Sequence, residues 1–255
     1  MIDIHCHVLP EIDDGSTSKQ MSVEMCAIAA DSKVTDIIAT PHMTDLYAKQ
    51  EFHDRVAVRL KYLNDKMKSE NIPVRIHKGA EVYASKDILY SPDLTDLTLA
   101  GSKYLLFEFS FVNSDFDYVK EVITVIQSQS LVPVIAHPER YDFIQRDYSN
   151  INRLSDCGAL FQCNLGSLTG ELGKREKRLA REMINKGAVS FLASDAHRVK
   201  FRNTDLSGML KCIEKDAKKL DMSNIEAYLN TNPALVLSGK TVPYPSPKPL
   251  QKHLF

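Results

Sequence analysis

Histidine, aspartate and glutamate side chains that can bind metal ions recur at wide intervals along this chain of 255 residues. The first of them, His5, lies in the first apolar segment, and the last is His197. The full set is His5, His7, Asp14, His42, Glu81, Glu108, His137, Asp195 and His197. Imidazole and carboxylate donors without a required thiolate favour manganese, iron or zinc over magnesium alone. The sequence therefore predicts a metal centre assembled from distant parts of the chain.

Two pairs within this set have the spacing of one face of a strand. His5 and His7 are separated by one residue, and Asp195 and His197 repeat that spacing. Alternate residues of a strand point to the same face, so each pair can bind one ion. A single pair of this kind is more often structural, so the interpretation depends on the other imidazole and carboxylate groups recurring at strand ends.

Three neighbouring aspartates each have two possible roles. Asp14 lies in a turn-like sequence directly after His7, and the alternative to a metal ligand is a turn or helix-cap residue. Asp13 is either a turn residue or a group that orients a ligand. Asp3 either orients a ligand histidine or is buried against a backbone partner. The remaining histidines are expected to be solvated or structural: His53, His77 and His253.

Short apolar segments alternate with longer helical segments, and these elements must position the set. Strands are predicted at residues 2–6, 36–40, 74–79, 103–107, 132–136, 160–163 and 189–194. Helices are predicted at residues 19–31, 50–70, 116–129, 149–157, 174–186, 204–219 and 223–230. This alternation indicates parallel strands joined by helices. Because the metal-competent residues fall at the ends of strands, we expect one α/β barrel with a site at its mouth.

Composition narrows the class of protein. The chain is 44% hydrophobic and 25% charged with a net charge of -1, which is typical of globular proteins and argues against a nucleic-acid partner. Its five scattered cysteines indicate neither disulfides nor a zinc ribbon. The apolar runs are too short to span a bilayer. We therefore expect a cytoplasmic protein without stable membrane insertion.

The last 13 residues differ from the rest. Pro243, Pro245, Pro247 and Pro249 predict an extended tail outside the core, so we expect a barrel domain over residues 1–242 and a tail over residues 243–255. The alternative is a segment that docks on a partner.

The charge of the set favours a phosphate substrate. Four carboxylates and five neutral imidazoles would neutralise two divalent ions, whereas three ions leave two positive charges in excess. A phosphate dianion would match that excess. Arg140 and Arg202 follow His137 and His197 in the expected mouth loops and could bind phosphoryl oxygens, with Arg198 as the competing arginine.

Several motifs together resemble one known family. They are MIDIHCH at residues 1–7, IDDG at 12–15, IATPH at 38–42, EF at 108–109, PVIAHPER at 133–140 and ASDAH at 193–197. Over residues 1 to about 240 the chain resembles the bacterial capsular and exopolysaccharide protein-tyrosine phosphatases of the polymerase and histidinol phosphatase (PHP) superfamily. The resemblance implies a single-domain, distorted seven-stranded (β/α) barrel and three divalent metal ions, usually manganese. It also implies a phosphotyrosine substrate on a bacterial tyrosine autokinase that controls polysaccharide export.

The resemblance also implies roles for individual residues. The family's metal ligands correspond to the nine residues above, and its phosphate-binding residues to Arg140 and Arg202. The chain departs from the family at Met43, where a second histidine is frequent, and at Asn164, where a small hydroxyl residue is common. We expect metal-bound hydroxide to attack phosphorus, with His42 or His197 as the proton donor.

Other functions stay open. The same centre could serve a small-molecule phosphatase acting on a compound such as histidinol phosphate, or a non-catalytic regulatory module stabilised by metal. A thiolate phosphatase is disfavoured because no cysteine has an arginine six positions later. An amidohydrolase is disfavoured because its bridging lysine is absent. Residues 166–178 predict a flexible loop followed by cations at a helix start, which either bind acidic residues near the phosphotyrosine or are ordinary surface charges.

Overall fold

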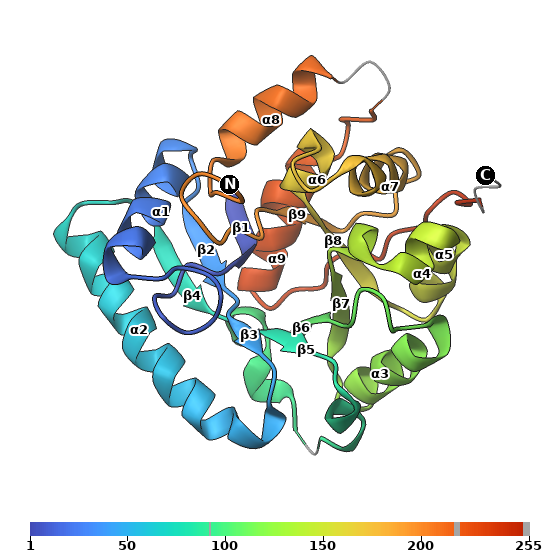
Figure 1. The fold of residues 1–255 in the computed structure, drawn as a ribbon, viewed down its shortest axis with the longest axis horizontal. Coiled ribbons are helices and arrows are strands. Elements are labelled where there is room, and N and C mark those ends of the chain that lie inside the picture. Colours follow the sequence, from blue (N-terminus) through green and yellow to red (C-terminus); the bar gives the residue numbers. More distant parts are fainter. Residues whose placement is uncertain (92, 217–219, 252–255) are drawn as a thin grey trace.

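The computed structural model describes residues 1–91, 93–216 and 220–251. Its strands are β1 Ile2–Cys6, β2 Asp36–Ala39, β3 His42–Met43, β4 Arg75–Lys78, β5 Glu81–Tyr83, β6 Tyr104–Glu108, β7 Val132–Ala136, β8 Leu160–Asn164 and β9 Phe191–Ala193. They form two parallel sheets with the orders β1-β2-β4 and β3-β5-β6-β7-β8-β9. Helices surround the strands, as Figure 1 shows, which gives the distorted α/β barrel that the sequence predicts.

The barrel closes between its first and last strands. Cys6 and Ala196 form a parallel bridge, and the backbone N–H of His7 donates to the Ala196 carbonyl at 2.9 Å. One step further in, the N–H of Asp195 donates to the carbonyl of His5 at 2.8 Å. The end of β1 is therefore joined to the segment after β9, next to residues that are expected to bind metal.

Two of the predicted strands bend near their ends and resume as separate short strands. β3 follows β2, and β5 follows β4, after gaps of two residues. A Cβ on Gly79 would lie 2.7 Å from a methyl group of Ile38, so this close approach requires glycine. The bend leaves His42 and Glu81 paired as the first residues of β3 and β5.

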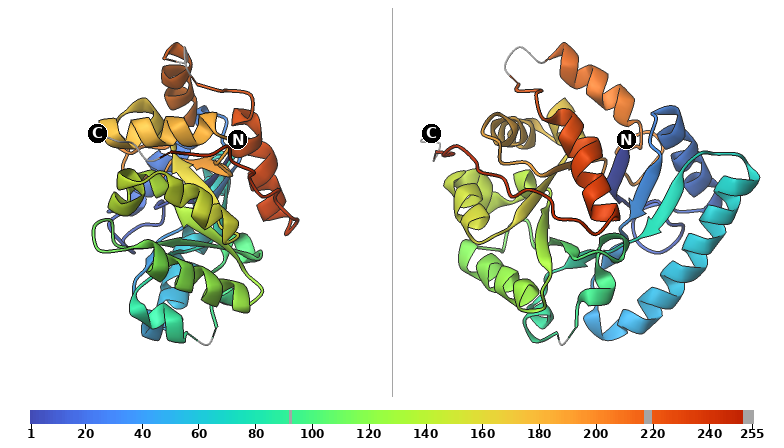
Figure 2. Two further views of the ribbon diagram at one scale, coloured as in Figure 1. Left: turned by 90° about the vertical axis from the view of Figure 1, so that its right-hand side faces the viewer. Right: turned by 180° about the vertical axis from the view of Figure 1, so that it is seen from behind.

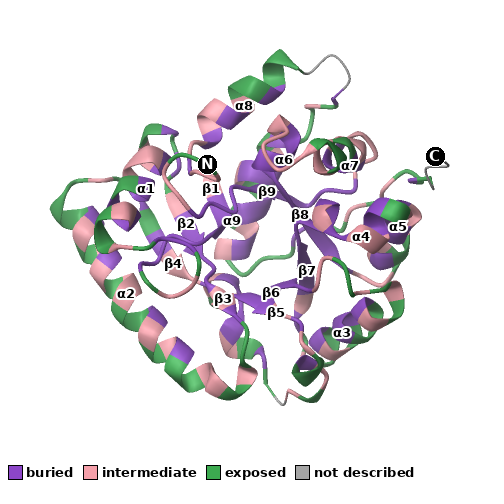
Figure 3. Cartoon of the chain, in the orientation of Figure 1, coloured by how far each residue is buried: buried purple, intermediate pink, exposed green. Residues whose placement is uncertain are grey.

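The α-helices are α1 Lys19–Asp31, α2 Lys49–Ser69, α3 Phe116–Ser128, α4 Asp142–Arg146, α5 Ser149–Asp156, α6 Leu165–Thr169, α7 Lys174–Asn185, α8 Leu206–Lys215 and α9 Asn232–Leu237. Side chains cap several of them: Ser18 accepts from the N–H of Met21, and Asp115 accepts from that of Tyr118. The buried faces of the helices pack on the strands while their outer faces are exposed, as Figure 3 shows. Short 3₁₀ turns cover Leu46–Ala48, Lys86–Tyr90, Thr95–Leu97, Leu99–Gly101 and Pro138–Arg140.

The core has two parts. The larger hydrophobic cluster lies between strands and helices, and the smaller one includes Ile4, Tyr104, Leu106 and Val134 from the strands and Val236 from α9. Tyr104 begins β6 and Val236 lies on α9, so α9 covers the end of the barrel at which the strands start. Figure 2 shows α9 across this face from behind. The polar residues that are predicted to bind metal lie at the opposite end of the barrel.

Three predictions about the second half of the chain differ from the structure. The predicted loop at the start of residues 166–178 is shorter than expected, because Leu165–Thr169 is a helix with Gly166, Ser167 and Leu168 buried. Only residues 170–173 connect it to α7, which begins at Lys174 as predicted. The last helix does not end at residue 230, since a π-helical turn at Ala227–Thr231 leads directly into α9, which has Pro233 in its first turn. The predicted helix 204–219 begins later, at Leu206, and residues 217–219 lie outside the described residues.

The proline-rich segment lacks helix and strand over residues 243–251 but is attached to the barrel. Leu250 is buried in the main hydrophobic cluster, although we expected the tail outside the core. The N–H of Lys248 donates to the carbonyl of Lys186, and that of Leu250 donates to Asn152. Residues 252–255 lie outside the described residues. Across the described part of the chain, no helix has the length and apolar character needed to cross a membrane.

Candidate metal centre

The metal-competent residues predicted from the sequence converge at the C-terminal ends of the strands. Their ligand atoms form four overlapping groups, each within 4.8 Å. The groups are His7, Asp14, His42 and His197; His5, His7 and Glu81; His5, His137 and Asp195; and His42, Glu81 and Glu108. Together they contain all nine predicted residues, which we call the nine-residue cluster.

The deepest part of the nine-residue cluster brings two imidazoles against two carboxylates. The Nε2 atoms of His5 and His7 are 3.2 Å apart, and each is 3.2 Å from Oε2 of Glu81 and 3.5 Å from Oδ1 of Asp195. Both carboxylate oxygens are buried without a hydrogen-bond partner among the described residues. An unpaired buried carboxylate oxygen is costly, and a cation beside it would remove that cost. These residues therefore fit a metal ion.

The outer part of the cluster surrounds His42. Its Nδ1 lies 3.1 Å from Oε2 of Glu81 and 3.1 Å from Oε1 of Glu108, while its Nε2 lies 3.3 Å from Oδ1 of Asp14. The other oxygen of Glu81 is 2.9 Å from Nε2 of His137. Glu81 thus contacts imidazoles from several parts of the barrel, and it belongs to two of the four groups that could hold an ion.

The backbone is strained where the cluster leaves the strands. His137, Asp195 and Arg202 have φ values of 33°, 50° and 49°, in the left-handed region that L-residues rarely adopt. Such strain persists only where the surrounding structure fixes the backbone, and it concentrates at functional sites. His137 directly follows β7 and Asp195 lies two residues after the end of β9, whereas Arg202 lies in the loop beyond.

Charges within the cluster shift the pKa values of its histidines in opposite directions. Burial alone lowers the pKa of His7, but the hydrogen bond to Asp13 and the close contact with Glu81 outweigh burial and raise the pKa to about 9. Burial likewise lowers the pKa of His42, but the nearby carboxylates of Asp14, Glu108 and Glu81 outweigh burial and raise this pKa. Burial, followed by repulsion from His7, lowers the pKa of His197 to about 3.

These shifts predict that metal binding releases protons at pH 7. Without metal, His7 is protonated below about pH 9, whereas a metal ligand must be neutral. The apparent affinity for a divalent ion should therefore rise with pH between about 6 and 9. Calorimetric titration in two buffers of different protonation enthalpy measures the number of protons released. Equal heats in both buffers at pH 7 would contradict the expectation.

Several buried polar residues orient the cluster. Oδ2 of Asp13 lies 2.7 Å from Nδ1 of His7 and also accepts the N–H of His42. Burial raises the pKa of Asp13, but these contacts outweigh burial and lower the pKa to about 2. Asp13 therefore orients a cluster histidine, which is one of the two roles predicted for it. Asp3 instead accepts the backbone N–H and the hydroxyl of Ser194, the residue that directly follows β9.

Strand β8 contributes support that the sequence analysis missed. Oε1 of Gln162 is 2.7 Å from Nδ1 of His5, and Nε2 of Gln162 donates to Asn164. Asn164 in turn donates to Oδ2 of Asp195 at 2.7 Å. Two fully buried amides on alternate positions of an otherwise apolar strand were the available signal. The sequence motifs mark Asn164 only as a departure from the family.

Replacement of Asp13 by alanine should weaken metal binding by about 10- to 100-fold, because loss of a residue that orients a ligand typically has that effect. The change leaves Nδ1 of His7 without its partner but removes none of the nine residues. The matched control is Glu24→Ala, an exposed position on α1. Titration of the metal-free proteins with Mn²⁺ measures the effect, and equal affinities for the two variants would refute the role of Asp13.

The two predicted arginines reach the same carboxylate. Nη2 of Arg202 is 2.7 Å from Oδ2 of Asp195, and Nη1 of Arg140 is 3.5 Å from it. Both line a cavity of about 150 Å³ with members of the nine-residue cluster. Arg198 does not line this cavity, because its Nη1 donates to the carbonyls of Asp14, Gly15 and His197. Arg198 therefore braces a loop, and Arg140 and Arg202 remain the candidates for binding an anion.

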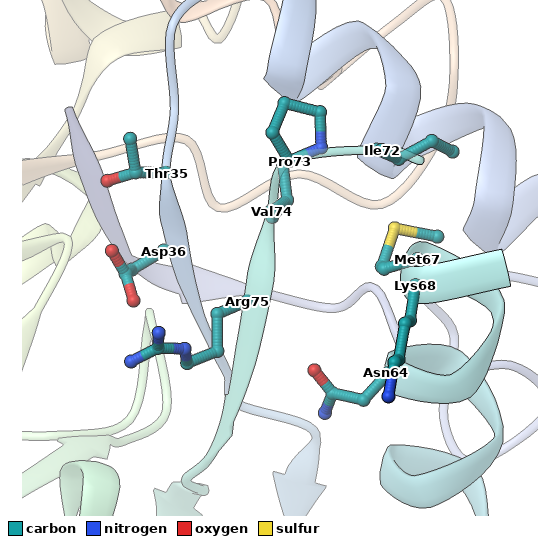
Figure 4. Close-up of a pocket in the computed structure, with 9 residues that line it drawn as sticks. All are labelled: Thr35, Asp36, Asn64, Met67, Lys68, Ile72, Pro73, Val74 and Arg75. Atoms are coloured by element: carbon teal, nitrogen blue, oxygen red, sulfur yellow. The ribbon is translucent and has the colours of Figure 1, made fainter. Parts of the chain in front are cut away.

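A larger hollow of about 580 Å³ lies elsewhere, between α2 and the first residues of β2 and β4. Figure 4 shows Asp36 and Arg75 on the two strands and Lys68 on the helix facing this hollow. It lies at the ends where the strands begin, opposite the nine-residue cluster. Function in parallel barrels is concentrated at the other end, so we place the candidate site at the cluster.

The chain is similar in sequence to capsular polysaccharide synthesis proteins and to tyrosine-protein phosphatases. The family model of capsular polysaccharide synthesis proteins CpsB/CapC matches residues 1–238. Tyrosine-protein phosphatase YwqE of Bacillus subtilis is 34% identical, with 99% of this chain and 97% of YwqE covered. Tyrosine-protein phosphatase CpsB of Streptococcus pneumoniae is 27% identical, with 95% of this chain and 100% of CpsB covered.

Solved structures agree with the sequence relatives. A crystal structure from a study of YwqE of Bacillus subtilis and CpsB of Streptococcus pneumoniae is similar to this chain, with a TM-score of 0.83 and 32% sequence identity. It covers 98% of this chain and 100% of its own. The two proteins are described there as unique metal-dependent tyrosine phosphatases. The phosphotriesterase homology protein of Escherichia coli shares only the fold, with a TM-score of 0.57, 10% identity, and coverage of 92% of this chain and 98% of its own. The chain belongs to the CpsB/CapC family of capsular polysaccharide synthesis proteins, as its motifs predicted.

Proposed function

We propose that this chain is a metal-dependent protein-tyrosine phosphatase that removes phosphate from a bacterial tyrosine kinase and thereby regulates capsular or exopolysaccharide synthesis. The main support is the convergence of nine imidazole and carboxylate side chains, two of which, Glu81 and Asp195, have a buried oxygen without a hydrogen-bond partner among the described residues. Relatives over nearly the whole chain are tyrosine-protein phosphatases, which narrows the reaction to phosphotyrosine hydrolysis.

The nine-residue cluster would hold three divalent ions, and manganese is our first choice, with iron or zinc as alternatives. Four carboxylates among the nine leave two positive charges in excess when three such ions are bound, which suits a phosphate dianion. Bound ions lower the pKa of a coordinated water toward 7 and polarise phosphoryl oxygens. No cysteine or serine nucleophile is then required.

Arg140 and Arg202 would bind the phosphoryl oxygens. Both guanidinium groups contact Asp195, and the side chains of Arg140 and Arg202 are 24% and 20% exposed. A substrate phosphate entering beside them would receive charge-assisted hydrogen bonds from two sides. These bonds neutralise charge that accumulates on the phosphoryl group during transfer.

The proton for the departing tyrosine oxygen would come from His42 or His197. Both imidazoles line the cavity, and their Nε2 atoms lie 3.3 Å and 3.4 Å from Oδ1 of Asp14. A phenolate has a pKa near 10 and leaves more readily than an alkoxide, so the demand on the donor is modest.

Hydrolysis of a phosphotyrosyl peptide from a bacterial tyrosine kinase tests the proposal. At equal concentration of the Mn²⁺-loaded protein, we expect kcat/KM for this peptide to exceed that for histidinol phosphate at least about tenfold. A chelator should abolish both activities, and added Mn²⁺ should restore them. A preference for histidinol phosphate would favour a small-molecule phosphatase. Absence of turnover with every metal would favour a regulatory module.

We also propose that residues 1–242 form the catalytic barrel, that the protein works in the cytoplasm, and that nucleic acid is not a partner. The near-neutral charge and the unpaired cysteines support this setting.

A further inference from the structure

One residue that lines the cavity of the candidate site is apolar, whereas the others are ionisable. The cavity of about 150 Å³ is lined by Asp14, His42, Glu81, Glu108, Phe111, His137, Arg140, Asp195, His197 and Arg202. Nine of these side chains are ionisable, and Phe111 is the exception. An apolar ring in a site that binds metal ions and phosphate needs a separate explanation, because it can contribute to neither.

Phe111 lies on the loop between β6 and α3, three residues after Glu108, and is partly exposed. Its ring lies 4.3 Å from the guanidinium carbon of Arg140 and 5.5 Å from the ring of Tyr141, which is stacked with it. The carbonyl of Phe111 accepts the N–H of Asp142 at 2.8 Å. Backbone and side chain therefore fix the ring beside the arginine that would bind phosphate.

We propose that Phe111 determines specificity for aryl phosphates by contacting the aromatic ring of the substrate. This inference rests on the proposed function. In a phosphotyrosine the ring is joined to phosphorus through a single oxygen, so a phosphate beside Arg140 brings the ring next to Phe111. Aromatic pairs gain free energy beyond the burial of apolar area, whereas alkyl groups lack this contribution.

The same contacts allow another role, since the ring also packs on Arg140. If Phe111 acted only by supporting Arg140, its replacement would weaken every phosphate ligand equally. If it contacts the substrate, the replacement should weaken aromatic ligands selectively. Comparison of an aryl with an alkyl ligand separates the two roles.

Binding of phenylphosphonate and methylphosphonate to the Mn²⁺-loaded protein, measured by calorimetry, tests the proposal without turnover. Phe111→Leu keeps apolar volume but removes the ring, and we expect it to weaken phenylphosphonate roughly three- to tenfold while methylphosphonate changes less than about twofold. Phe111→Tyr should restore the affinity for phenylphosphonate. Val112→Ala is the matched control, because Val112 is the next residue, is 66% exposed and does not line the cavity.

Equal weakening of both phosphonates by Phe111→Leu, or no change in either, would overturn the proposal. So would failure of Phe111→Tyr to bind phenylphosphonate better than Phe111→Leu. Thermal denaturation of each variant identifies a loss of fold before the affinities are compared. A different result would refute the proposed function. In that case the wild-type protein binds the aryl phosphonate selectively but does not hydrolyse phosphotyrosine.

Discussion

Replacement of Asp195 by asparagine is expected to lower metal content and phosphotyrosine hydrolysis together, with a loss of rate on the order of 10³-fold. Asp195 is fully buried in the nine-residue cluster, and its Oδ1 lies 3.5 Å from both His5 and His7. Its Oδ2 contacts Arg202 and Asn164. Asparagine keeps the shape but removes the negative charge that would offset a bound cation.

Asp156→Asn is the matched control, because Asp156 is exposed at the end of α5. It should change neither the metal content nor the rate. Metal analysis and peptide hydrolysis on the same preparations measure both effects. A variant of Asp195 that keeps its full metal content and activity would remove this residue from the centre.

Replacement of Arg140 by alanine should spare the metal and reduce kcat by about 10²- to 10³-fold, the range found when one donor to a developing negative charge is removed. Arg140 lines the cavity and contacts Asp195 through a single 3.5 Å pair, so the cluster loses little when it is removed. Arg140→Lys should retain part of the rate, because lysine supplies a charge without the planar fork.

Arg146→Ala provides the control for Arg140. Arg146 is exposed on α4, where it pairs with Asp142, and its replacement should leave turnover unchanged. Unchanged turnover in Arg140→Ala would show that its assigned role is wrong. Loss of metal in that variant would show that Arg140 acts through the cluster.

Much of the fold is predictable because apolar periodicity reports burial directly. The strands at Ile2–Cys6 and Val132–Ala136 and the helix at Lys19–Asp31 have the predicted bounds. β3 and β5 were missed because each is only two or three residues long and follows a bend that periodicity does not reveal. The sequence predicts a loop from residue 166, where the structure has the short helix Leu165–Thr169, because glycine and serine occur in both.

The residues of the site were predictable for a different reason. Parallel strands bring their C-terminal ends together, so residues such as His5, Glu81 and Asp195 converge although they are far apart in sequence. Supporting residues are harder to predict, because a buried Gln162 or a half-exposed Phe111 has no spacing that distinguishes it from residues of the core or surface. Their roles depend on contacts across the barrel, to His5 and to Arg140 respectively.

Anomalous diffraction from crystals of the Mn²⁺-loaded protein, recorded on both sides of the manganese absorption edge, tests the central claim most directly. We predict three peaks per chain, each at about 2.0–2.3 Å from imidazole or carboxylate atoms of the nine-residue cluster. Peaks at other positions, or a cluster without manganese in crystals that bind the ion elsewhere, would contradict the account.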